Sequence, residues 1–126
     1  MKFRYTILYV ADVSETVCFY EKAFGFKADL IHETGDYAQL STGETKLAFA
    51  SKGLMSSLGT TTGDSNEQSP VFEIAFETDD VEFCLNQAVN AGAGLVQEAS
   101  KMDWGQTVSY VKDNNGFLVE ICSPVS

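Results

Sequence analysis

The sequence predicts an α+β protein in which two βαβββ modules form one curved sheet, with a concave pocket inside and helices outside. Three observations predict this class. Short runs of β-prone apolar residues occur along the whole chain, a helical apolar pattern follows the first strand of each half, and the element order of the first half returns in the second. We expect one domain over residues 1–126, with one module at about 1–51, a connector at 52–70 and a second module at 71–126.

The composition is that of a globular domain. Hydrophobic residues make up 44% of the 126-residue chain, and no apolar run approaches the roughly 18 residues of a membrane span. The first residues lead into a strand without a signal-peptide pattern. The three cysteines are scattered and predict neither a disulfide framework nor a zinc site. These features favour a reducing, cytoplasmic location.

The net charge of −10 restricts the partners. Nucleic acid and anionic membrane surfaces call for a basic patch, so neither is expected as a partner. A cationic or neutral small molecule is compatible with the charge, and a plainly solvated acidic surface is the alternative interpretation.

The first module begins with a β-prone run at 5–10. Asp12 or Ser14 can cap the helix expected near 14–24, and Gly25 is a C-terminal stop signal. Further strands are expected at 26–32, 37–40 and 46–50.

The connector at 52–70 is rich in Ser, Thr, Gly, Asp, Asn and Gln. Leu54, Met55 and Leu58 are its apolar anchors. A plain linker and a flap over a pocket are both compatible with this composition.

The second module repeats the order, with a strand at 72–77, an acidic cap at Asp79 and Asp80, a helix near 81–91 and a short strand at 95–97. Two β-prone runs within 104–122 flank a turn at 113–116 and predict a β-hairpin.

Superposing the two modules pairs Tyr5 with Glu73 and Ala48 with Glu120. This repeated order indicates an internal duplication.

Glu120 is a carboxylate in an otherwise apolar strand, on the same face as Leu118 and Cys122. If both faces of the sheet are covered, this carboxylate is buried or lines a cavity and needs a metal, a cation or hydrogen bonds. An exposed strand face or a structural hydrogen bond is the alternative. By the same alternation, the concave face should also carry Glu73, Ala75 and Glu77 from the second module and Tyr5, Ile7 and Tyr9 from the first.

Six stretches of the sequence match motifs of a known family. They are the runs at 7–13 and 18–26 (with Phe-Tyr-x-x-x-Phe-Gly-Phe at 19–26), Gly-Asp-Tyr at 35–37, the run at 76–81, Trp-Gly-Gln-Thr at 104–107 and the run at 113–121 (with Asp-x-x-Gly-x-x-x-Glu at 113–120). On these motifs the chain resembles the vicinal oxygen chelate superfamily, which includes glyoxalase I, extradiol dioxygenases, fosfomycin-modifying enzymes and bleomycin-resistance binding proteins. The resemblance covers nearly the whole chain except the connector.

In metal-dependent members of this superfamily, four positions supply His, Glu or Gln to one divalent ion. The resemblance places these positions at Tyr5, Ala48, Glu73 and Glu120. Ala48 has no donor atom and a tyrosine phenol is a poor ligand for such ions, so no metal cofactor is expected. One divalent ion held by Glu73 and Glu120 is the weaker alternative. His32, the sole histidine, does not match a ligand position.

Two functions follow. The first is a binding protein that sequesters a cationic or aromatic compound or drug, as the bleomycin-resistance members do, with aromatic walls and carboxylates in the concave pocket. The second is an enzyme, a glyoxalase-type lyase or isomerase or a dioxygenase, in which Glu73 and Glu120 hold an ion or act as catalytic groups. The resemblance also implies a homodimer. The expected ligand-binding residues are Tyr5, Ile7, Tyr9, Tyr37, Gln39, Ala48, Ala75, Trp104, Gln106, Tyr110 and Glu120.

Overall fold

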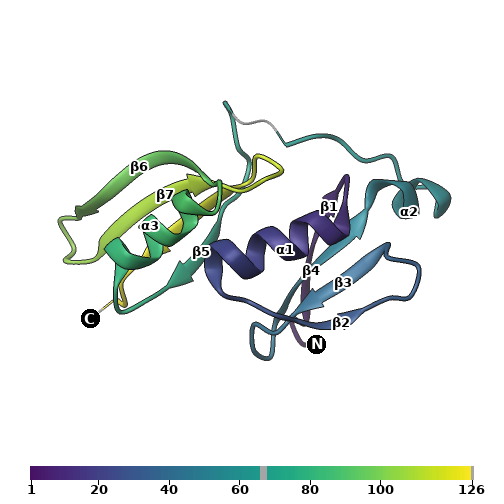
Figure 1. Ribbon diagram of the computed structural model, residues 1–126, viewed down its shortest axis with the longest axis horizontal. Helices are drawn as coiled ribbons and strands as arrows, with labels where there is room; N and C mark the ends of the chain where they lie inside the picture. The colour runs from purple at the N-terminus through teal and green to yellow at the C-terminus, as the bar shows by residue number, and fades with distance from the viewer. Residues whose placement is uncertain (66–67, 126) are drawn as a thin grey trace. The chain divides into compact units, whose positions relative to one another are not determined.

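The computed structural model describes residues 1–65 and 68–125. Figure 1 shows its helices and strands in chain order. The elements are β1 (Tyr5–Val10), α1 (Val13–Phe24), β2 (Ala28–Ile31), β3 (Tyr37–Leu40), β4 (Lys46–Ser51), α2 (Lys52–Ser57), β5 (Ile74–Glu77), α3 (Val81–Asn90), β6 (Gly94–Lys101), β7 (Thr107–Lys112) and β8 (Leu118–Cys122).

The strands form two mixed four-stranded sheets, ordered β1-β4-β3-β2 and β5-β8-β7-β6. We call them the N-terminal and the C-terminal sheet. The chain divides into two compact units: residues 1–21 with 25–64, and residues 22–24 with the chain from Ser65 onward. The α+β class and the two similar βαβββ modules predicted from the sequence are confirmed. Hydrogen bonding defines one sheet per module, where one curved sheet was expected.

The same parallel pairing organises both sheets. β1 pairs with β4 so that Ile7 lies opposite Ala48, and β5 pairs with β8 so that Ala75 lies opposite Glu120. Ala48 and Glu120 therefore occupy equivalent register positions, as the superposition of the modules predicted.

Helix α1 covers one face of the N-terminal sheet. Asp12 caps it by accepting a hydrogen bond from the Glu15 amide at 3.0 Å, and Gly25 ends it in the left-handed conformation that glycine tolerates. The ring of Tyr20 packs against that of Phe49 on β4, with centroids 5.0 Å apart. The opposite face, which carries Tyr5, Ile7 and Tyr9, is the helix-free face of this sheet.

Helix α3 covers one face of the C-terminal sheet in the same manner. Asp80 caps it through the Phe83 amide at 3.1 Å, and its buried residues are Val81, Leu85 and Ala88. Val119 and Ile121 of β8 are buried toward the helix. Glu120 alternates with them and therefore belongs to the helix-free face.

The tight turn of the predicted hairpin is confirmed, and it joins β7 to β8. The carboxylate of Asp113 accepts hydrogen bonds from the amides of Asn115 and Phe117 at 2.8 and 2.9 Å, and Gly116 has a φ of 84°. Turn residues with short polar side chains therefore set the register in which Tyr110 lies opposite Glu120.

Several expected boundaries were wrong. The connector contains the helix α2, which Ser51 caps through the Leu54 amide at 3.0 Å. β6 runs for 8 residues instead of a short 95–97 strand, because it pairs along most of β7. β5 begins at Ile74, so Glu73 lies just before the strand. Within the described residues, no helix is long and apolar enough to cross a membrane.

Candidate functional site

The helix-free face of the C-terminal sheet gathers a cluster of acidic groups and a phenol around Glu120. Tyr110 on β7 donates a hydrogen bond from its phenol to Oε1 of Glu120 at 2.8 Å. Glu73, Glu77 and Cys122 are the other titratable groups that interact with Glu120 or its neighbours. We call these five residues the Glu120 cluster.

The proton affinities of the cluster reflect the partial burial of its members and its negative charge. Burial, the charge of Glu120 and a hydrogen bond with Glu120 all raise the pKa of Glu73 above its ordinary value. Burial and the Glu120 carboxylate raise the pKa of the Tyr110 phenol to about 12. Burial and Glu120 likewise raise the pKa of the Cys122 thiol to about 11. The phenol and the thiol are therefore neutral at physiological pH, and Glu73 holds its proton more tightly than an isolated glutamate.

No cation compensates these carboxylates among the described residues. The salt bridges there join Lys46 to Asp29 and Lys52 to Asp64, and neither involves Glu73 or Glu120. Two neighbouring carboxylates without a basic partner favour either a shared proton or a bound cation.

Trp104 and Gln106 lie at the end of the same sheet, in the turn between β6 and β7. The indole Nε1 of Trp104 donates to Oε1 of Gln106 at 2.8 Å, and Nε2 of Gln106 donates to the carbonyl oxygen of Ser123 at 2.9 Å. Gln106 also lowers the pKa of the Cys122 thiol, which connects the turn to the Glu120 cluster.

The helix-free face of the N-terminal sheet is aromatic and apolar. Tyr5, Ile7 and Tyr9 alternate along β1 with exposed fractions of 47%, 41% and 36%. Ala48 lies opposite Ile7 and is fully buried. A row of exposed apolar side chains along an edge strand is suited to contact with a ligand or a partner.

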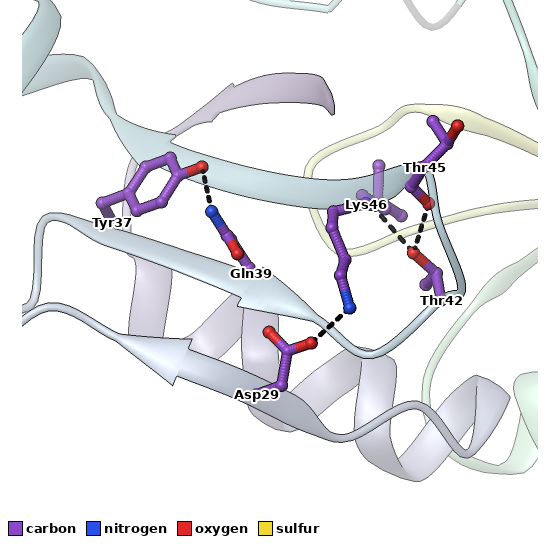
Figure 2. A network of polar contacts seen from close by, with 7 residues as sticks. Asp29, Tyr37, Gln39, Thr42, Thr45 and Lys46 are labelled. Carbon is purple, nitrogen blue, oxygen red and sulfur yellow. Dashed lines mark hydrogen bonds and ion pairs between the residues drawn. The ribbon is translucent and has the colours of Figure 1, made fainter. Parts of the chain in front are cut away.

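Polar side chains on β2, β3 and β4 of the same sheet form a network of contacts, which Figure 2 shows. Nε2 of Gln39 donates to the phenol oxygen of Tyr37 at 3.0 Å, and Nζ of Lys46 lies 2.6 Å from a carboxylate oxygen of Asp29. The only basic side chain in this network is therefore already paired with a carboxylate.

The predicted site residues thus fall into groups within each unit. Glu73, Tyr110 and Glu120 come together, as do Trp104 with Gln106 and Tyr37 with Gln39. Ala75 lies opposite Glu120 in the register. His32 is exposed, and its Nδ1 lies 2.9 Å from the hydroxyl of Thr34 in a local turn.

Sequence reasoning missed two features of the site. For Cys122, the sequence predicts only that it shares a strand face with Glu120. The pairing of Asp29 with Lys46 is not predicted at all. Alternation along β8 carried the signal for Cys122. Nothing in the local sequence pairs residue 29 with residue 46, because that contact depends on the bulged pairing of β2 with β3.

A divalent metal does not fit the residues at the four equivalent positions. Ala48 offers a methyl group and Tyr5 an exposed phenol, which leaves only Glu73 and Glu120 as ordinary donors. Within the described part of the chain, no group of three or more His, Cys, Asp or Glu side chains could hold a metal ion.

A β-α-β-β-β module that occurs twice, each time with its own mixed four-stranded sheet, defines the class of fold to which this protein belongs. The profile of the Glyoxalase/Bleomycin resistance protein/Dioxygenase superfamily matches residues 2–121. The chain belongs to this superfamily.

Solved structures agree with the fold. A glyoxalase-related enzyme from Fulvimarina pelagi is 19% identical with a TM-score of 0.83, over 98% of this chain and 88% of that one. A glyoxalase/bleomycin resistance protein/dioxygenase family enzyme from Burkholderia phytofirmans PsJN is 20% identical with a TM-score of 0.77, over 100% of both chains. TioX from Micromonospora sp. ML1 is 21% identical with a TM-score of 0.75, over 98% of each chain. Comparison with curated protein sequences gives no match.

Proposed function

We propose that the protein binds a small organic cation that carries an aromatic or other apolar group, and that it does so without turnover. The observation that carries this proposal is the half-buried Glu120, which has a phenol donor and a neighbouring carboxylate but no salt bridge within the described residues. A bound cation would compensate the charge that burial makes unfavourable.

Aromatic side chains in each of the two units support the same ligand class. The C-terminal sheet offers Tyr110 and Trp104, and the N-terminal sheet offers Tyr5, Tyr9 and Tyr37. Aromatic faces attract cations through the ring quadrupole and pack well against planar apolar groups. The net charge of −10 would also draw a cationic ligand toward the protein.

The family is compatible with binding alone. Its description joins glyoxalases and dioxygenases with bleomycin resistance proteins, so the shared fold serves catalysis in some members and resistance in others. Because the donor set at positions 5, 48, 73 and 120 does not suit a metal, a function that needs no metal is the simpler assignment. Protein purified without chelator should accordingly carry far less than one equivalent of Zn, Ni, Mn or Fe.

The central test replaces Glu120 by glutamine and measures the affinity for benzyltrimethylammonium by calorimetry. Glu120→Gln keeps the shape of the side chain and removes its charge, so we expect the affinity to fall more than tenfold, since losing one member of a partly buried charge pair costs about 2–5 kcal/mol. Glu98→Gln, on an exposed position of β6, removes an equal charge and should change the affinity less than twofold.

A thermal-shift panel tests the charge preference independently of any variant. Organic cations should raise the melting temperature, and anions of similar size should not. Stabilisation by anions or neutral thiol conjugates, with cations inert, would overturn the cation-binding proposal.

The raised pKa of Glu73 favours one second candidate, a glyoxalase-type isomerase that works by acid–base chemistry. A glutamic acid that keeps its proton can deliver it, and the neighbouring Glu120 carboxylate can accept one. Proton exchange at the carbon next to a carbonyl, followed by NMR in heavy water with a thiol–methylglyoxal adduct, tests this candidate. Exchange that disappears in both Glu73→Gln and Glu120→Gln would favour the enzyme over the binding protein.

We also propose that the protein is a homodimer. β1 and β5 are edge strands of their sheets, and unpaired edges are commonly covered by a second chain. Light scattering should give twice the mass of the chain at micromolar concentration; the mass of one chain would contradict this.

A further inference from the structure

Gln106 uses both ends of its side-chain amide. Its Oε1 accepts the indole N–H of Trp104 at 2.8 Å, and its Nε2 donates to the backbone carbonyl of Ser123 at 2.9 Å. An amide nitrogen has a second hydrogen, and Gln106 also lowers the pKa of the nearby Cys122 thiol. Gln106 therefore ties the indole to the C-terminal end of β8.

The backbone beneath Trp104 is tightly turned as well. The Met102 amide donates to the Gln106 carbonyl at 2.8 Å, and the Gly105 amide donates to the Met102 carbonyl at 2.9 Å. Gly105 has a φ of 96°, which glycine adopts without strain. This turn fixes the Cα of Trp104, so the remaining freedom of the residue lies in its side-chain torsions.

Trp104 is nevertheless 64% exposed. Exposed side chains ordinarily change rotamer within picoseconds to nanoseconds, and core packing cannot restrain a side chain that projects this far into solvent. The hydrogen bond to Gln106 is the contact that restrains the indole, and it leaves the ring faces available.

We infer that Gln106 is a positioning residue that holds the Trp104 indole as a fixed aromatic platform for the ligand, so that the site prefers cations bearing an aromatic ring over alkyl cations. This inference rests on the proposed function and names the ligand class more closely. Gln106 lowers the pKa of the Cys122 thiol, and Cys122 lies two positions after Glu120 along β8. The residue that holds the indole therefore lies at the end of the same sheet as the carboxylate.

The first experiment needs no ligand. Trp104 is the only tryptophan of the chain, so time-resolved fluorescence anisotropy reports on this side chain alone. The wild-type decay should follow overall tumbling, and Gln106→Leu should add a fast nanosecond component. Gln87→Leu is the matched control, because Gln87 also donates one hydrogen bond to a backbone carbonyl, that of Lys22, but lies on α3.

The second experiment measures ligand preference with two probes, phenethyltrimethylammonium and tetramethylammonium. The wild-type protein should bind the phenyl-bearing probe at least about fivefold more tightly, and Gln106→Leu should reduce this preference about fivefold, within the range of one aromatic contact. The affinity for tetramethylammonium should change less than twofold. Trp104→Ala should abolish the preference.

The outcomes separate the inference from the proposed function. An unchanged anisotropy decay in Gln106→Leu overturns the positioning role, whatever the protein binds. A new fast component with an unchanged probe preference overturns the role of Gln106 in selectivity. Failure of wild-type protein to bind either probe overturns the proposed function and the ligand preference together, while the anisotropy still decides whether Gln106 positions the indole. If Gln106→Leu does not fold, Gln106→Ala gives the same readouts.

Discussion

Tyr110 and Glu120 face each other across the β7–β8 hairpin, and the phenol of Tyr110 donates a 2.8 Å hydrogen bond to the Glu120 carboxylate. The turn at Asp113 sets this pairing, so the donor is in place before any ligand arrives. The bond satisfies one oxygen of Glu120 and leaves the charge of the carboxylate uncompensated. The hydrogen bond from Tyr110 and the charge of Glu120 can therefore be removed separately by mutation.

Replacing Tyr110 by phenylalanine should weaken both the fold and the proposed site. The loss of one hydrogen bond to a half-buried carboxylate should lower the free energy of unfolding by about 1 kcal/mol. The affinity for benzyltrimethylammonium should fall by a smaller factor than in Glu120→Gln, because the charge remains. Urea unfolding and calorimetry measure the two effects. Tyr5→Phe, a matched loss of one exposed hydroxyl, should change the unfolding free energy by less than half as much.

The two N-caps allow a test of how far the modules are equivalent. Asp12 and Asp80 each accept one amide hydrogen bond at a helix start, at 3.0 and 3.1 Å. Asp12→Ala and Asp80→Ala should each cost about 1 kcal/mol of stability, and the double variant should lose the sum, since the two caps share no partner. Chemical denaturation of the three variants measures this. Asp103→Ala, at an exposed turn position, is the control and should stay within about 0.5 kcal/mol of wild type. Single losses that differ by more than about 1 kcal/mol would show that the modules do not depend on their caps equally.

The cysteines should differ in reactivity by several orders of magnitude. Cys122 is 6% exposed, and burial with the Glu120 charge raises the pKa of its thiol to about 11, so only roughly one molecule in ten thousand carries the thiolate at pH 7. Cys18 is exposed on α1. Native protein treated with iodoacetamide should be modified at Cys18 long before Cys122, as peptide mass spectrometry would show. Equal rates at the two positions would contradict the burial of Cys122, and denatured protein is the control in which both should react.

Local sequence predicted most of the fold because its signals are local. The helix starts depend on Asp12 and Asp80, and the hairpin depends on the turn beginning at Asp113; a short polar side chain at each of these positions hydrogen-bonds the neighbouring backbone. Strand alternation was sufficient to place Glu120 on the face opposite Val119 and Ile121. Helix propensity could not predict α2, since Lys52–Ser57 contains one glycine and two serines in a stretch whose composition is typical of loops.

The site was less predictable because its contacts join residues far apart in the chain. The approach of Glu73 to Glu120 depends on the parallel pairing of β5 with β8, which no local pattern specifies. The hydrogen bond by which Gln106 holds the Trp104 indole depends on the position of the Ser123 carbonyl after β8, because Gln106 also donates to that carbonyl. Sequence reasoning selected these side chains by type and strand face, and the hydrogen bonds that connect them required the structure.

Glu73 should make ligand binding and stability respond to pH in opposite directions. A bound cation favours the ionised carboxylate, so binding should weaken as pH falls through the raised pKa of Glu73, at a pH above that of an ordinary glutamate. In the ligand-free protein, a folded-state pKa above the unfolded value favours folding of the protonated form. The stability that Glu73 contributes is therefore complete below its unfolded pKa and is lost as pH rises through its folded pKa.

Glu73→Gln separates these two effects, because glutamine keeps a hydrogen-bonding side chain that cannot ionise. Near pH 7 the variant should melt at a higher temperature than wild type, since it relieves the repulsion with Glu120, and this gain should vanish at acid pH. The pH dependence of benzyltrimethylammonium binding should lose the step assigned to Glu73. Tyr110 and Cys122 stay neutral throughout this range and add no step. Melting curves measure the stability, and calorimetry measures the affinity, between acid and neutral pH. A Glu73→Gln variant that is less stable than wild type at pH 7 would contradict the raised pKa of Glu73.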